Sequence, residues 1–94
     1  MQNPVLFHLQ AHHRGKSKAI SSRKLEAIFG IKGSELRQIV NELRSEGNPI
    51  CSGDTGYYYA ANETELNRTI AQLSSRANSI TNARDGLVAA LAVI

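Results

Sequence analysis

The chain contains very little cysteine, proline and tryptophan. Its 94 residues include one cysteine, Cys51, two prolines and no tryptophan. A single cysteine excludes a disulfide within the chain and is typical of proteins from a reducing cytoplasm. We therefore expect a cytoplasmic protein whose fold depends on packing and hydrogen bonds rather than on cross-links.

Long hydrophobic runs are also missing. The longest run, residues 87–94, has eight residues, whereas a helix that crosses a bilayer needs about 20. The first residues, Met-Gln-Asn-Pro-Val-Leu-Phe-His, lack the basic start and apolar core of a secretory signal. We expect neither a membrane partner nor a secretory leader.

Sequence motifs of enzymes are missing as well. There is no glycine-rich phosphate loop, no nucleophile motif and no carboxylate pair in a recognisable frame. His8 and His12 are four residues apart and His13 follows, but a zinc site takes about three or four ligands. The other soft ligand, Cys51, is distant in the sequence. The sequence predicts no catalytic residues, no metal site, no cofactor and no small-molecule substrate.

The charge that is present is unevenly distributed. The net charge is +3, with 41% hydrophobic and 20% charged residues, as in a folded globular protein. Residues 1–47 carry eight Lys or Arg and four Glu, a balance of +4, whereas residues 48–94 carry three Arg and four acids, a balance of −1. A basic half beside a nearly neutral half is typical of a protein that contacts a polyanion with one side.

Three helices are predicted in the basic half. Asn3-Pro4 is a helix start, and the apolar residues after it predict a helix to about His12. Residues 13–17 are expected to form a loop, and residues 19–20 a short strand. Ser21 is the expected N-cap of the second helix, which ends at Gly30.

The third helix has a buried stripe and two alternative starts. Either Ser34 caps it, or an earlier cap at Lys32 places Glu35 at the capping-box position. Gly47 and the proline after it end the helix. Helical spacing predicts that four apolar residues face inward: Leu36, Ile39, Val40 and Leu43.

A hairpin and a long helix complete the expected fold. Residues 50–52 and 57–60 are rich in strand formers and flank a turn, Gly-Asp-Thr-Gly, which carries an acid and no base. Tyr57 and Tyr59 should share one face of the hairpin and Tyr58 the other. The fold class is therefore mainly α with a small β-hairpin (α+β). It comprises a winged helix-turn-helix in residues 1–61 and a C-terminal helix in residues 62–94 for packing or dimerisation.

The C-terminal helix carries a regular apolar seam. From residue 66 to residue 94, steps of four and three residues alternate, and eight of the nine positions are apolar. A break or kink is expected at Gly86. We expect this helix to pair with a second copy, in an antiparallel or bundled arrangement, with folding back onto the first helix as the alternative. The expected dimerisation residues are Leu73, Ala77, Ile80, Leu87, Leu91 and Ile94.

Two sets of polar residues are candidates for contact with DNA. Arg can hold a guanine edge, and Gln and Asn an adenine edge, with two hydrogen bonds each. The outward side of the third helix therefore predicts base contacts by Ser34, Arg37, Gln38 and Asn41. Cations neutralise phosphates without reading sequence. The expected phosphate contacts are Arg14, Lys16, Lys18, Arg23, Lys24 and Lys32.

Residues 20–60 resemble the winged helix-turn-helix DNA-binding modules of bacterial regulators, such as the amino-terminal domain of the biotin repressor. The matching segments are Leu-Glu-Ala-Ile-Phe-Gly-Ile, Leu-Arg-Gln-Ile-Val-Asn-Glu-Leu-Arg, and Gly-Asn-Pro-Ile followed by Gly-Tyr-Tyr-Tyr. The hairpin with the later Leu-Ser-Ser-Arg is similar to small proteins encoded by bacteriophages and prophages. The resemblance implies a location in a bacterial host cell and base contact by the third helix.

These observations lead to a principal hypothesis and an alternative. The first is a dimeric, non-enzymatic protein that binds double-stranded DNA with residues 33–46 in the major groove, as a phage or prophage regulator or an accessory factor in replication or packaging. The alternative is a protein-interaction adaptor that uses the winged fold as a scaffold and the C-terminal helix as the partner surface.

Overall fold

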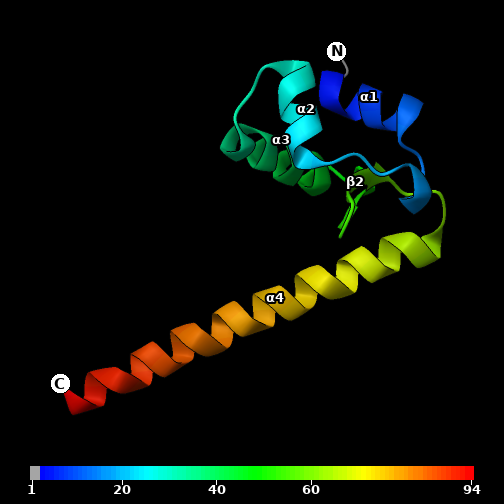
Figure 1. Cartoon of the computed structure of the whole chain (residues 1–94). Coiled ribbons are helices and arrows are strands. Elements are labelled where there is room, and N and C mark those ends of the chain that lie inside the picture. The colour runs from blue at the N-terminus through cyan, green and yellow to red at the C-terminus, as the bar shows by residue number, and fades with distance from the viewer. Residues whose placement is uncertain (1–2) are drawn as a thin grey trace.

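The computed structural model describes residues 3–94. Their fold is mainly α with one small antiparallel hairpin and a long C-terminal helix, as expected from the sequence. Figure 1 shows α1, α2, α3 and the hairpin gathered into a body from which α4 extends. The elements in order are α1 (Pro4–His12), the 3-10 helix η1 (Lys16–Lys18), α2 (Ser22–Phe29), α3 (Gly33–Ser45), β1 (Ile50–Gly53), β2 (Gly56–Tyr59), α4 (Glu63–Ala90) and the 3-10 helix η2 (Leu91–Val93).

The expected caps of α1 and α2 are confirmed. The side chain of Asn3 accepts the N–H of Val5 at 2.8 Å, and the hydroxyl of Ser21 accepts the N–H of Lys24 at 3.2 Å. These bonds satisfy amide groups that have no partner inside the first turn. Gly30 ends α2 in the left-handed conformation, with φ 62°.

The start of α3 agrees with the earlier of the two alternatives. Lys32 is the N-cap in an extended conformation and makes no capping bond with its side chain, so the Ser34 alternative is wrong. The acid of the first turn, Glu35, lies where the helix dipole favours a negative charge. Leu36 is fully buried, which requires the helix to begin early enough to turn this residue inward.

One hydrophobic core joins α1, α2, α3 and β1. Leu9, Leu25 and Leu36 have no exposed surface, and Ile50 is almost fully buried among them. On α3, Leu36, Val40 and Leu43 are buried and Ile39 packs against the same cluster, so the predicted inward stripe is confirmed.

The hairpin presents different tyrosines on its two faces, as predicted. Cys51 pairs with Tyr58 in antiparallel register. Tyr57 and Tyr59 pack against the main core, whereas Tyr58 joins Cys51 and Ala60 in a second cluster on the other face.

The connection between α1 and α2 differs from the expectation. Residues 16–18 form η1, where part of a loop was expected. The expected strand at residues 19–20 is reduced to a single bridge, in which Ile20 exchanges backbone hydrogen bonds of 2.9 and 2.8 Å with Tyr57. Ser21 begins the cap of α2 directly afterwards, which leaves no further residue to extend the pairing.

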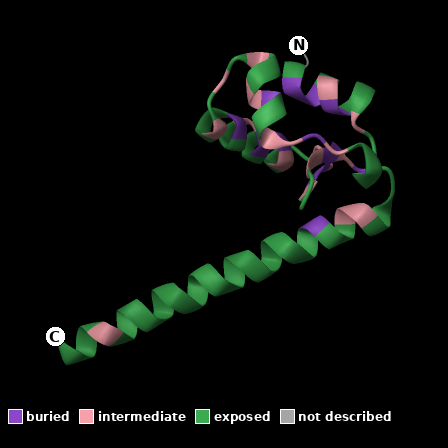
Figure 2. Ribbon diagram, viewed as in Figure 1, coloured by how far each residue is buried: buried purple, intermediate pink, exposed green. Residues whose placement is uncertain are grey.

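Only the first turns of α4 pack against the body. Asn62 caps the helix, Leu66 joins the cluster of Cys51 and Tyr58, and Thr69 is buried. Every residue from 70 to 89 is exposed, as the continuous green ribbon in Figure 2 shows. The alternative in which this helix folds back onto α1 is therefore wrong, because α4 points away from the body (Figure 1).

The expected break at Gly86 is also wrong, since α4 continues through it to Ala90. A glycine costs only about 1 kcal/mol in a helix, and the leucine and alanines that follow favour helix. A helix of 28 residues is about 42 Å long at 1.5 Å per residue.

Candidate functional site

The outward side of α3 is a polar surface opposite the buried stripe. Ser34, Arg37, Gln38 and Asn41 are all exposed. Together with Glu42, Ser45 and Glu46 they line a shallow hollow along the helix. The side-chain amide of Gln38 donates to the Glu42 carboxylate at 3.4 Å. This surface is thus basic near the start of α3 and acidic near its end.

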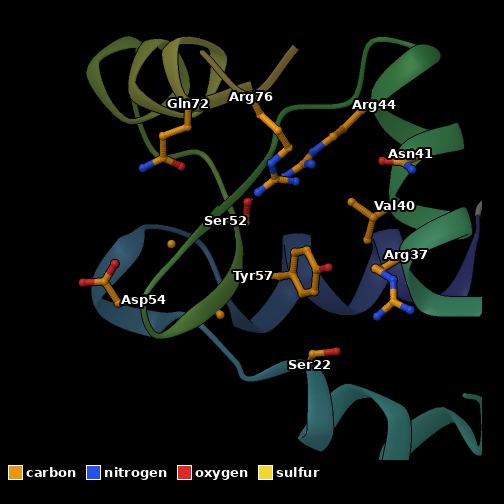
Figure 3. A pocket seen from close by; sticks show the side chains of 12 residues that line it. Ser22, Arg37, Val40, Asn41, Arg44, Ser52, Asp54, Tyr57, Gln72 and Arg76 are labelled. Carbon is orange, nitrogen blue, oxygen red and sulfur yellow. Dashed lines mark hydrogen bonds between the residues drawn. The ribbon is translucent and has the colours of Figure 1, made fainter. Parts of the chain in front are cut away.

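Arg37 and Asn41 also line a second hollow. This groove of about 610 Å³ lies between α3, the hairpin and the first half of α4 (Figure 3). Each of these elements contributes polar side chains. The groove is lined by Ser22 from α2, Arg37, Val40, Asn41 and Arg44 from α3, Ser52, Gly53, Asp54, Gly56 and Tyr57 from the hairpin, and Gln72 and Arg76 from α4.

Arg44 connects α3 to the hairpin at the base of this groove. Its Nε donates to the carbonyl of Ile50 at 2.9 Å, and Nη2 donates to the hydroxyl of Ser52 at 3.1 Å. Burial lowers the pKa of the Arg44 guanidinium, and the nearby charge of Arg76 lowers it further, although Tyr57 and Cys51 oppose this. Figure 3 shows Arg44 and Arg76 reaching into the same part of the groove.

Arg44 and Arg76 are candidate site residues that the sequence pattern did not predict. Arg44 follows Arg37 by seven residues, about two helical turns, so helical spacing could have placed both on the same side of α3. Arg76 reaches the groove because the start of α4 packs beside β1. This packing cannot be predicted from the residues near Arg76 in the sequence.

The cations expected to contact phosphates are exposed but do not form one cluster. Lys32 is the N-cap of α3, beside the outward side of that helix. Arg23 and Lys24 directly follow Ser22, which lines the groove. Lys16 instead lines a separate hollow with Ser17, Ala19 and Thr55, next to the hairpin tip. The Arg14 guanidinium carbon lies 6.0 Å from the ring centroid of Tyr59. Lys18 ends η1. The structure therefore divides the set between the α3 side and the η1 side.

The three histidines lie together at the end of α1. The Nε2 atoms of His8 and His13 are 3.2 Å apart, and the rings of His8 and His12 have centroids 5.0 Å apart. Within residues 3–94, no three side chains of His, Cys, Asp or Glu are arranged to hold a metal ion.

The seam residues of α4 are uncovered in the single chain. All six expected dimerisation residues are exposed, from Leu73 near the body to Ile94 at the end of the chain. Their burial would require a partner outside this chain.

A scan against protein-family models and searches of curated proteins and solved structures find no match to the chain. Across the described residues, no helix is both long enough and apolar enough to pass through a membrane. Only the residues and geometry of the chain itself therefore support a function.

Proposed function

We propose that the protein is a non-enzymatic, sequence-specific double-stranded DNA-binding protein that places α3 in the major groove. The observation that supports this most directly is the exposure of Arg37, Gln38 and Asn41 on a helix whose opposite side is buried in the core. These side chain types can each form paired hydrogen bonds with a base edge, which contribute about 1–3 kcal/mol of discrimination. The turn at Gly30 between α2 and α3 completes a helix-turn-helix arrangement.

The exposed cations supply contacts that do not depend on sequence. Lys32 directly precedes α3, and Arg23 and Lys24 lie on α2, which packs against α3. These three cations fix the protein on the strand that α3 reads. Arg14, Lys16 and Lys18 contact phosphates farther along the duplex. A regulator of a phage or prophage, or an accessory factor in replication or packaging, fits this combination of a reading helix and separate backbone contacts.

The test is a titration of the purified chain against duplex DNA fragments at two salt concentrations. Arg37→Ala should lose preference for the selected fragment by about tenfold, which corresponds to one lost base contact. Lys24→Ala should weaken binding to every fragment and reduce the slope of log affinity against log salt by about 1. Absence of binding to any fragment at low salt would refute the proposal.

We also propose that α4 pairs with α4 of a second copy. Its apolar seam repeats with coiled-coil spacing, and residues 70–89 contain only two arginines and one acid to oppose close approach. Two copies would cover side chains that are more than half exposed, among them Ile80, Leu87 and Leu91.

Light scattering tests this pairing. Ile80→Asp places a charge in the seam and should shift the protein to the monomer, whereas Ser79→Asp places the same charge on an exposed position outside the seam and should not. A monomeric unaltered chain would reject self-pairing and favour the adaptor function, in which α4 binds a different protein. In that case, deletion of residues 86–94 should abolish binding of that protein and leave DNA affinity unchanged.

A further inference from the structure

We infer that Arg44 and Arg76 form a phosphate-binding site in the groove between α3, the hairpin and α4. This inference rests on the proposed function, in which the phosphate belongs to a DNA strand, and it makes the first half of α4 part of the DNA interface. The shared chemistry is a phosphate group, which could also belong to a free phosphate-bearing ligand.

The groove has too few acids to balance its arginines. Among the described residues, the one ion pair with atoms within 4.0 Å is Arg84 with Asp85, so neither Arg44 nor Arg76 has a carboxylate that close. Asp54 is the single acid among the residues that line the groove, against three arginines. The two guanidinium groups share one part of the groove and repel each other, and an anion between them would relieve that repulsion.

The two guanidinium groups retain N–H donors that can bind an anion. A guanidinium has about five N–H donors in a planar fork, and Arg44 uses one at Nε and one at Nη2. Its remaining donors, and those of Arg76, suit the paired oxygens of a phosphate. The Ser52 hydroxyl accepts from Arg44, so its own hydrogen can be donated to an anion.

The position of the groove also favours a phosphate of a DNA strand. Arg37 and Asn41 line both the groove and the outward hollow of α3, so the groove opens beside the surface proposed to read bases. Residues 50–60, which form the hairpin, contain no Lys or Arg. On this side of α3, Arg44 and Arg76 therefore add to the positive charge of Arg37 that a DNA strand would meet.

The experiment uses Arg76→Ala and Arg76→Glu in the full chain, because Arg76 is exposed and its loss leaves the core intact. The matched controls are Arg68→Ala and Arg68→Glu, on the same helix but outside the groove. Duplex affinity is measured by fluorescence anisotropy at several salt concentrations, with light scattering to verify that assembly is unchanged. Inorganic phosphate is titrated in parallel, and the Nε–H signals of the arginines are followed by NMR.

We expect Arg76→Ala to weaken duplex binding about tenfold and to reduce the salt slope by about 1, and Arg76→Glu to weaken binding further. The Arg68 variants should change affinity less than about twofold. Phosphate should shift the Arg44 signal in the unaltered chain and much less in Arg76→Ala.

The outcomes separate the inference from the proposed function. If Arg37→Ala weakens DNA binding but both Arg76 variants bind like the unaltered chain, the phosphate site is wrong and the DNA-binding function stands. If no duplex binds but phosphate shifts the Arg44 signal saturably, the DNA-binding function is wrong and the site serves a free phosphate-bearing ligand. If neither duplex nor phosphate binds, both are wrong.

Discussion

The carboxylate of Glu65 accepts the backbone N–H of Lys16 at 3.0 Å, which joins the first turn of α4 to η1. Its other oxygen accepts the N–H of Ala61 at 2.9 Å. These two bonds, first that of Ala61 and then that of Lys16, lower the pKa of the Glu65 carboxyl because they favour its charged form. The bond to Lys16 therefore helps to hold the start of the long helix against the segment that carries Lys16 and Lys18.

Replacement of this carboxylate should loosen the attachment of α4. Glu65→Gln should lower the melting temperature at pH 7, because a neutral amide accepts the two N–H groups less strongly than a charged carboxylate. The pKa of Glu65 in the folded chain lies below the ordinary 4.5. Glu65 therefore contributes to the free energy of unfolding above pH 4.5, and this contribution is lost as the pH falls through the folded pKa. Thermal melts between pH 3 and pH 7 measure this loss. Glu63→Gln, an exposed acid of the same first turn, is the control and should keep the acid dependence of the unaltered chain.

The histidines at the end of α1 should make stability depend on pH near neutrality. The Nδ1 of His13 lies 2.8 Å from the Lys18 carbonyl oxygen, which can only accept, so this nitrogen carries the hydrogen. In the neutral ring, the Nε2 of His13 is then an acceptor for the Nε2–H of His8. Burial, with the charges of His13 and His12, lowers the pKa of His8 below 6.5. Neutral His8 therefore contributes to the free energy of unfolding above pH 6.5, and this contribution is lost as the pH falls through the lower pKa of His8 in the folded chain.

Melting temperatures at pH 7.5 and pH 5 check this dependence. We expect a lower value at pH 5 for the unaltered chain and a smaller difference for His8→Gln. His12→Gln removes an exposed imidazole and should retain most of the difference. A melting temperature that stays constant or rises on acidification would contradict the expected role of His8.

The hairpin should tolerate a side chain at one of its turn glycines and not at the other. Gly56 has φ 125°, and a Cβ there would collide with the carbonyl of Ile20 and with Ser21. Gly56→Ala should destabilise the fold by about 1–3 kcal/mol from backbone strain alone. At Gly53 a Cβ meets nothing within 4 Å, so Gly53→Ala is the matched control and should change stability by less than about 1 kcal/mol. Urea denaturation measures both, and equal losses would contradict the collision with Ile20.

The single thiol should be unreactive while the chain is folded. Cys51 is fully buried, and burial raises the pKa of its thiol, which disfavours the reactive thiolate. Thiol modification in native buffer should therefore be slow and should accelerate in urea. Thr55→Cys adds a second, exposed thiol at the hairpin tip and should show one fast and one slow phase. Fast reaction of Cys51 in the native chain would contradict its burial.

The beginnings of α1, α2 and α4 and the end of α2 were readable from the sequence because they depend on neighbours a few residues away. Asn3, Ser21 and Asn62 each satisfy an amide of the first helical turn, and Gly30 takes a left-handed conformation that is costly for most residues. The inward stripe of α3 and the alternation of the hairpin tyrosines likewise follow from helical and strand periodicity. Where two local signals competed, as at Lys32 and Ser34, the sequence left the start of α3 open.

Tertiary packing decided the features on which the candidate site depends. The groove exists because Thr69, Leu66 and Glu65 hold the start of α4 against the hairpin and η1, and this brings Arg76 to Arg44. Such contacts join residues far apart in the chain, so they cannot be predicted from composition or periodicity. Periodicity predicted the apolar seam of α4. Only the structure showed that α4 points away from the body, so that the chain itself leaves this seam uncovered.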